Sequence, residues 1–237
     1  MSTYILIHGA WHGAWCWDKV IPFLEKEGHT VITPDLPAHG NDKTPISEVT
    51  LQTYADRVCD VVNAQTEKII LVGHSMGGIA ITQAAEHCSD KIQKLVYITA
   101  FLLQNGEFLV QYAQDDREAL VMPNLVMAED GSCSTLKDEA VKQAFYEDCS
   151  DEDIIWAKKN LVPQPAAPFV TPLSTTDENF GKIPRVYIEC LQDKAISPSF
   201  QKKMYTNLSC EKVFSMNTSH SPFLSAPEEL ANILLSL

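Results

Sequence analysis

Six short apolar runs, separated by stretches of helical pattern, constrain the fold of this chain more than any other feature. The runs are rich in β-branched residues and cover residues 4–8, 30–33, 69–73, 95–99, 185–189 and 212–214. Runs of this length and composition predict strands that are buried on both faces of a sheet. Helical patterns follow at residues 18–27, 51–65, 78–88 and 227–237. Strands and helices in alternation predict an α/β fold with a mostly parallel six-stranded sheet flanked by helices.

The alternation stops between residues 102 and 181. This stretch is polar and acidic, and it contains helical patterns at residues 136–146 and 151–160. Because the apolar runs before and after it both belong to the predicted sheet, the stretch is an insertion before the last two strands. We expect residues 1–101 and 182–237 to form the core, and residues 102–181 to form a helical cap. Such a cap lies over the carboxyl ends of the strands, where α/β proteins bind their ligands.

Composition and charge exclude several classes of protein. The chain has 237 residues, of which 45% are hydrophobic and 21% charged, as in an ordinary globular protein. The formal net charge of −13 repels nucleic acid and anionic membranes. No apolar run is long enough to cross a membrane, and the N-terminus does not have the pattern of a signal peptide. We therefore expect a cytoplasmic protein that binds neither nucleic acid nor membranes.

The cysteines and histidines do not form a metal-binding pattern. The chain has seven cysteines, an odd number, and no two are spaced as C-x-x-C. This argues against a disulfide framework and against a thiolate zinc site, and it favours free thiols in a reducing compartment. His8 and His12 are four residues apart, but they span a predicted strand-to-loop turn and not one helix face. The sequence predicts no metal site.

The strongest chemical signal is the pentapeptide at residues 73–77, GHSMG, between a predicted buried strand and a predicted helix. In this context G-x-S-x-G forms a sharp turn that exposes a nucleophilic serine above the sheet. Glycines at both ends leave room for the close approach of strand and helix. The pattern predicts Ser75 as a catalytic nucleophile.

A nucleophilic serine needs a base, and in this arrangement the triad residues follow in the order serine, acid, histidine. Only His87 and His220 follow Ser75 in the chain. His87 lies three turns along the helix after the motif, whereas His220 lies in a loop after the last strand, so we predict His220. Asp193, just beyond the strand at residues 185–189, is the predicted acid. Glu189, at the end of that strand, is the alternative.

The oxyanion of an acyl-transfer reaction needs two backbone donors. The residue directly after the nucleophile supplies one, which predicts the Met76 N–H. The turn after the first strand supplies the other, and there we assign the Ala10 N–H. Aromatic residues near these loops are candidates for the walls of the substrate pocket, as is the neighbour of the nucleophile: Trp11, His74, Phe101, Trp156 and Phe223.

Two longer motifs resemble one branch of the α/β hydrolases. They are residues 8–15 (HGAWHGAW) and 73–78 (GHSMGG), and Asp193 followed by Ile196 and Gln201 completes the pattern. The branch contains the plant methyl esterases of the salicylate and jasmonate type and the hydroxynitrile lyases. The resemblance runs from residue 4 to the C-terminus and is weakest in the cap.

The resemblance implies hydrolysis of a small carboxylic ester, without a metal or an organic cofactor, and it allows a homodimer. The catalytic triad of the family falls on Ser75, Asp193 and His220, and its oxyanion donors fall on Ala10 and Met76. Residues 34–40 (PDLPAHG) depart from the plant members, so the plant hormone substrates are not carried over.

Three other functions remain open: a hydroxynitrile lyase on the same triad, a hydrolase-fold protein that only binds a small molecule, and a cofactor-free dioxygenase. Lyases of the resembling branch carry a lysine after the catalytic histidine and a threonine after the first-strand histidine. Here these positions are Ser221 and Gly9. Both departures favour hydrolysis over cyanohydrin cleavage.

Overall fold

A six-stranded, entirely parallel sheet forms the centre of the computed structural model, which describes all 237 residues. The strand order is β2-β1-β3-β4-β8-β9. The bounds of the strands are β1 (Thr3–Ile7), β2 (Thr30–Ile32), β3 (Ile69–His74), β4 (Ile92–Ile98), β8 (Arg185–Cys190) and β9 (Lys212–Met216). Each predicted apolar run is one of these strands. All residues of β3 are buried, as expected for a central strand covered on both faces.

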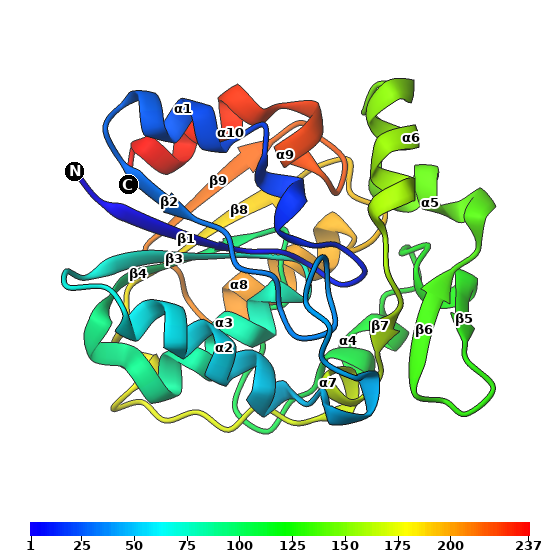
Figure 1. Cartoon of the computed structure of the whole chain (residues 1–237), viewed down its shortest axis with the longest axis horizontal. Helices are drawn as coiled ribbons and strands as arrows, with labels where there is room; N and C mark the ends of the chain where they lie inside the picture. Colours follow the sequence, from blue (N-terminus) through cyan, green and yellow to red (C-terminus); the bar gives the residue numbers. More distant parts are fainter.

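Helices cover both faces of the sheet (Figure 1). On one face lie α1 (Ile21–Lys26) and α10 (Pro227–Leu235), and on the other lie α2 (Leu51–Asn63), α3 (Gly77–Cys88) and α8 (Pro198–Asn207). The sequence pattern predicted four of these helices but not α8, which has only two buried side chains and therefore a weak apolar stripe. Its start is fixed by the Ser197 hydroxyl, which accepts a hydrogen bond from the Phe200 N–H at 3.4 Å.

The insertion between β4 and β8 lies at the carboxyl ends of the strands, on the right of Figure 1. Its helices are α4 (Leu109–Asp115), α5 (Asp138–Phe145), α6 (Asp151–Asn160) and α7 (Ala167–Val170). The insertion contains helices, as the sequence predicted, but it is not helical throughout. The insertion also contains a small antiparallel sheet of β5 (Leu125–Met127), β6 (Cys133–Leu136) and β7 (Gln164–Pro165). These strands are too short to show an alternating apolar pattern, so the sequence did not reveal them.

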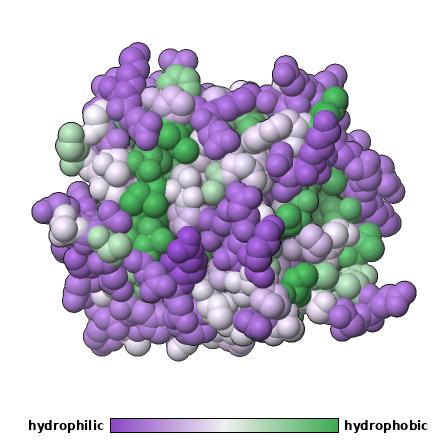
Figure 2. Space-filling model, in the orientation of Figure 1, coloured by the Kyte–Doolittle hydropathy of each residue, from purple (hydrophilic) through white to green (hydrophobic).

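Short helical turns complete the chain. They are η1 (Ala14–Trp17), η2 (Ile46–Glu48), η3 (Ser89–Lys91), η4 (Met122–Asn124), η5 (Phe180–Lys182) and α9 (Pro222–Ser225). The face drawn in Figure 2 is mostly hydrophilic, with hydrophobic residues gathered in narrow strips. None of the helices has the length and hydrophobicity that crossing a membrane requires. All seven cysteines are free thiols.

Candidate active site

Ser75 occupies a strained turn between β3 and α3. Its φ angle of 53° lies in the left-handed region, which is unfavourable for any residue with a side chain. The surrounding backbone holds this conformation: the Ser75 N–H donates to the Ile98 carbonyl at 3.3 Å, and the Ser75 carbonyl accepts from Gly78 and Phe101, each at 3.0 Å. The side chain is nearly buried, with 8% of the residue exposed. The motif therefore forms the strained elbow that the sequence predicted.

Gly77 allows the elbow to lie directly against the loop that follows β1. A methyl group on Gly77 would lie 2.7 Å from the His8 carbonyl oxygen and 2.8 Å from the Ile7 carbonyl oxygen. Both neighbours are backbone atoms of a central strand or of its end, so they cannot move aside cheaply.

We expect Gly77→Ala to lower the free energy of unfolding by about 1–3 kcal/mol, because the added methyl group overpacks this contact. Chemical denaturation followed by circular dichroism measures the change. Gly181→Ala is the matched control, since its added methyl group meets no atom closer than 3.1 Å. Equal stability of the two variants would contradict the role given to Gly77.

His220 and Asp193 form a buried pair at the carboxyl ends of β9 and β8. The His220 Nδ1 lies 2.7 Å from the Asp193 Oδ2, and both side chains are buried. A carboxylate only accepts hydrogen bonds, so Nδ1 carries the proton. The Nε2 nitrogen is then the basic nitrogen of the ring, as a general base requires.

The Asp193 carboxylate is held on both of its oxygens. Oδ1 accepts from the Ala195 N–H at 2.6 Å and the Ile196 N–H at 3.0 Å. Oδ2 accepts from the Thr99 hydroxyl as well as from His220. Thr99 follows β4 directly, and the sequence analysis missed it. Its position could have revealed it, because Thr99 is a polar residue at the carboxyl end of the strand beside the elbow.

The two alternatives to these residues lie elsewhere. The Glu189 carboxylate accepts from the Tyr205 hydroxyl at 3.1 Å and the Ser215 hydroxyl at 2.7 Å, and it forms no bond to His220. His87 lies on α3 and contacts only two glutamine side chains, each at 3.4 Å. The structure thus pairs Asp193 with His220, and neither Glu189 nor His87 belongs to this pair.

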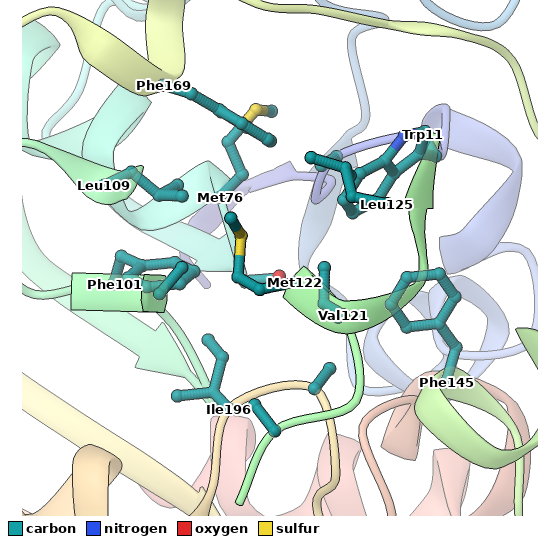
Figure 3. A pocket seen from close by; sticks show the side chains of 15 residues that line it. Trp11, Met76, Phe101, Leu109, Val121, Met122, Leu125, Phe145, Phe169 and Ile196 are labelled. Carbon is teal, nitrogen blue, oxygen red and sulfur yellow. The ribbon is translucent and has the colours of Figure 1, made fainter. Parts of the chain in front are cut away.

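A small apolar cavity of about 30 Å³ opens at Ser75 (Figure 3). Ser75 is the one polar residue among the fifteen that line it. Trp11 and Phe101 line the cavity. The other lining residues come from the insertion and from the loops around the elbow: Ala10, Met76, Leu109, Ala113, Ala119, Val121, Met122, Leu125, Phe145, Phe169, Ala195 and Ile196.

Three of the predicted pocket residues do not line this cavity. His74 and Phe223 are fully buried, and their rings pack against each other at 4.9 Å. The His74 Nε2 donates to the His220 carbonyl at 2.8 Å, and burial lowers the pKa of His74 well below its usual range, so the ring stays neutral. Trp156 lies on the outer side of α6, where it is 37% exposed and packs edge-on against Trp15. His74, Phe223 and Trp156 therefore contribute to the packing of the fold and not to the cavity wall.

The two predicted oxyanion donors both lie beside Ser75. Ala10 and Met76 line the cavity, and neither backbone N–H donates a hydrogen bond to another protein group. The loop before Ala10 is also close, since a methyl group on Gly9 would lie 2.8 Å from the Ser75 Cβ. Two unpaired amides are thus available to a developing negative charge.

The structure shows no group of three or more His, Cys, Asp or Glu side chains arranged to hold a metal ion.

The serine hydrolases of this fold share one arrangement: a serine with a left-handed backbone conformation lies between a parallel strand and a helix, near a buried histidine–carboxylate pair. Comparison of the sequence with protein families names the family. Residues 4–233 match the profile of the alpha/beta hydrolase family, so the chain belongs to this family and the resemblance of its motifs is confirmed.

Some relatives are similar over nearly their whole length. Methylesterase 9 of Arabidopsis thaliana is 33% identical over 260 residues, which cover 100% of this chain and 98% of that protein. Salicylic acid-binding protein 2 of Nicotiana tabacum is 33% identical over 251 residues, covering 99% and 96%. The crystal structure of polyneuridine aldehyde esterase superposes with a TM-score of 0.88 at 26% identity, covering 100% of this chain and 98% of that one.

Proposed function

We propose that this ester hydrolase of the alpha/beta hydrolase family cleaves small carboxylic esters with an apolar acyl group, through a triad of Ser75, His220 and Asp193. The observation that carries the proposal is the position of Ser75, the one polar residue in the wall of an otherwise apolar cavity. The buried His220–Asp193 pair and the unpaired amides of Ala10 and Met76 supply the remaining groups that acyl transfer requires.

In the proposed mechanism the Ser75 Oγ attacks the ester carbonyl carbon while the His220 Nε2 takes the hydroxyl proton. Asp193 stabilises the imidazolium ion that forms. The Ala10 and Met76 amides bind the oxyanion. The imidazolium then gives its proton to the departing alkoxide, so the alcohol leaves and an acyl-enzyme remains. Water attacks this acyl-enzyme with the same base, which releases the acid and restores Ser75.

The cavity wall supports the choice of acyl group. Its lining contains no charged side chain and, apart from Ser75, no polar one. A charged acyl group would lose its hydration there without gaining a partner, at a cost of several kcal/mol. Met76 and Met122 add flexible thioethers that adapt to apolar groups of different shape (Figure 3). Relatives named methylesterases support methanol as the alcohol part, so methyl esters are the proposed substrates.

We expect kcat/KM for apolar methyl and p-nitrophenyl esters to exceed that for matching esters with a carboxylate in the acyl group by roughly 100-fold or more, because of this desolvation cost. The measurement is steady-state hydrolysis of a series with equal chain length, such as hexanoate against hemiadipate esters. Comparable rates for charged and neutral members would contradict the proposed acyl specificity.

A second assay, with a cyanohydrin as substrate, separates hydrolysis from cyanohydrin cleavage. Ser221 follows His220, and no cationic side chain lines the cavity to stabilise a departing cyanide ion. Incubation with mandelonitrile should release cyanide no faster than the uncatalysed background. Enzymatic release of cyanide without any ester turnover would reverse the proposal in favour of a lyase.

A further inference from the structure

Three consecutive residues of the insertion each bond to a different loop of the candidate site. They lie in the turn between α5 and α6, which we name the clamp turn (residues 146–148). Tyr146 bonds to the loop after β1, Glu147 to the loop after β8, and Asp148 to the loop after β9. These three loops carry the oxyanion donor Ala10, the acid and the base of the proposed mechanism.

We propose that Tyr146 and Asp148 are positioning residues for the reaction proposed above: through the clamp turn, the insertion sets the geometry of the oxyanion donor and of the base. This inference rests on the proposed function, because it gives the turn a role in that reaction.

The first bond acts through a buried histidine. The His12 Nδ1 lies 2.7 Å from the Ala10 carbonyl oxygen, which can only accept, so Nδ1 carries the proton. The His12 Nε2 then accepts from the Tyr146 hydroxyl at 2.7 Å. Burial lowers the pKa of His12 to about 3, so the ring remains neutral and this directed chain of bonds persists at neutral pH. Through His12, Tyr146 thereby holds the carbonyl of Ala10, in the peptide group directly after the proposed donor N–H.

Two further bonds from the insertion hold the same loop. The Trp11 indole N–H donates to the Ser134 carbonyl at 2.9 Å, and the Val162 N–H donates to the Trp11 carbonyl at 2.9 Å. Trp11 has a φ angle of 63°, a conformation that persists only when its surroundings hold it. The insertion therefore contributes three of the bonds that hold the loop after β1, alongside bonds from the core such as that of the Ala14 N–H to Asp35.

The second positioning bond lies next to the base. Asp148 accepts from the Ser219 N–H at 2.9 Å with one oxygen and from the Ser219 hydroxyl with the other. Ser219 is buried and directly precedes His220. A carboxylate that accepts from both the amide and the side chain of one residue restricts the backbone there. Asp148 is thus placed to fix the backbone from which the base extends.

The third contact provides an internal control. Glu147 pairs with Lys194 at 2.6 Å, but the two side chains are 44% and 45% exposed. Exposed ion pairs contribute little because water and salt screen them. Glu147→Gln should therefore leave turnover unchanged within about twofold, although Glu147 lies between the two positioning residues.

The test compares Tyr146→Phe and Asp148→Ala with this control in the full-length protein. For Tyr146→Phe we expect kcat on an apolar p-nitrophenyl ester to fall about tenfold, because the oxyanion donor is misplaced. Affinity for a trifluoromethyl ketone, which forms the oxyanion adduct, should fall by a similar factor, and affinity for the product acid should change less than twofold.

For Asp148→Ala we expect kcat and the rate of Ser75 labelling by a fluorophosphonate each to fall about tenfold, because the base is misplaced. Asp148→Asn keeps one acceptor oxygen and should restore part of this loss. Tyr4→Phe controls for stability: Tyr4 is a buried tyrosine whose hydroxyl donates to the Leu234 carbonyl at 2.9 Å, so its loss should lower the melting temperature and leave kcat unchanged.

The outcomes separate the two proposals. If wild-type protein shows Ser75-dependent turnover but Tyr146→Phe and Asp148→Ala behave like Tyr4→Phe, losing stability without losing kcat, the positioning role is overturned and the proposed function stands. If the wild-type protein shows no Ser75-dependent turnover at all, the proposed function fails and this inference fails with it. Loss of kcat in both variants, with analogue affinity lost in Tyr146→Phe and labelling slowed in Asp148→Ala, supports both.

Discussion

Replacement of Ser75 by alanine is expected to lower kcat for ester hydrolysis by on the order of 10³-fold or more while leaving the fold intact. Without the hydroxyl no acyl-enzyme forms, and only the oxyanion amides and the cavity remain to accelerate attack by water. The measurement combines steady-state kinetics on a p-nitrophenyl ester with mass spectrometry after fluorophosphonate treatment. Wild-type protein should gain one label, and the variant none.

Ser89→Ala is the matched control for this experiment. Ser89 lies just beyond α3, and its exposure of 7% is close to the 8% of Ser75, but it is outside the cavity. Its loss should change kcat less than twofold, the usual effect of a substitution far from the reacting groups. The double variant Ser75→Ala/His220→Ala should be little worse than either single variant, because the residues act as a unit. Near-wild-type turnover by Ser75→Ala would end the proposed mechanism.

Asp193→Asn is expected to lower kcat by roughly 10³- to 10⁴-fold with little change in fold. The carboxylate accepts the Nδ1 proton of His220 and so leaves Nε2 unprotonated. An asparagine that turns its NH₂ group toward the ring favours the opposite tautomer, in which Nε2 carries the proton and cannot act as a base. The carboxylate oxygens also accept from Thr99, Ala195 and Ile196, and the amide cannot satisfy all of these donors.

A parallel Glu189→Gln variant completes this test. Glu189→Gln removes a carboxylate from the same strand and loop region, but one that bonds to Tyr205 and Ser215. It should retain most of the activity. If Glu189→Gln is the damaging change and Asp193→Asn is not, the acid has been assigned to the wrong residue.

The sheet and the catalytic loops could be predicted because both depend on patterns local to a strand. A run such as residues 69–73 is apolar throughout, since both faces of β3 are covered. Parallel strands end at the same edge of a sheet, so a residue just after a strand, such as Asp193 or His220, lies at the same edge as the elbow. Chain order and position therefore sufficed to bring the acid and the base together.

The cavity wall could not be predicted in the same way. Most of its side chains come from the insertion, where residues such as Met122 and Phe169 lie in short turns without a repeating pattern. Aromatic character alone selected Phe223 and Trp156, but one packs inside the core and the other on the outer side of α6. The cytoplasmic location stays a prediction of the sequence, and the homodimer stays a possibility that the family resemblance allows.

The position of His220, the proposed base, has a consequence for partial unfolding. His220 follows β9, which lies at one edge of the sheet and pairs with β8 alone. Four of the five residues of β9 are exposed or only partly buried. Edge strands open at a lower free energy than central ones. The proposed nucleophile, by contrast, follows β3 in the middle of the sheet. In the proposed mechanism, catalysis therefore depends on one of the least protected strands, and we expect local opening at this edge to abolish activity while the central strands still give a native spectrum.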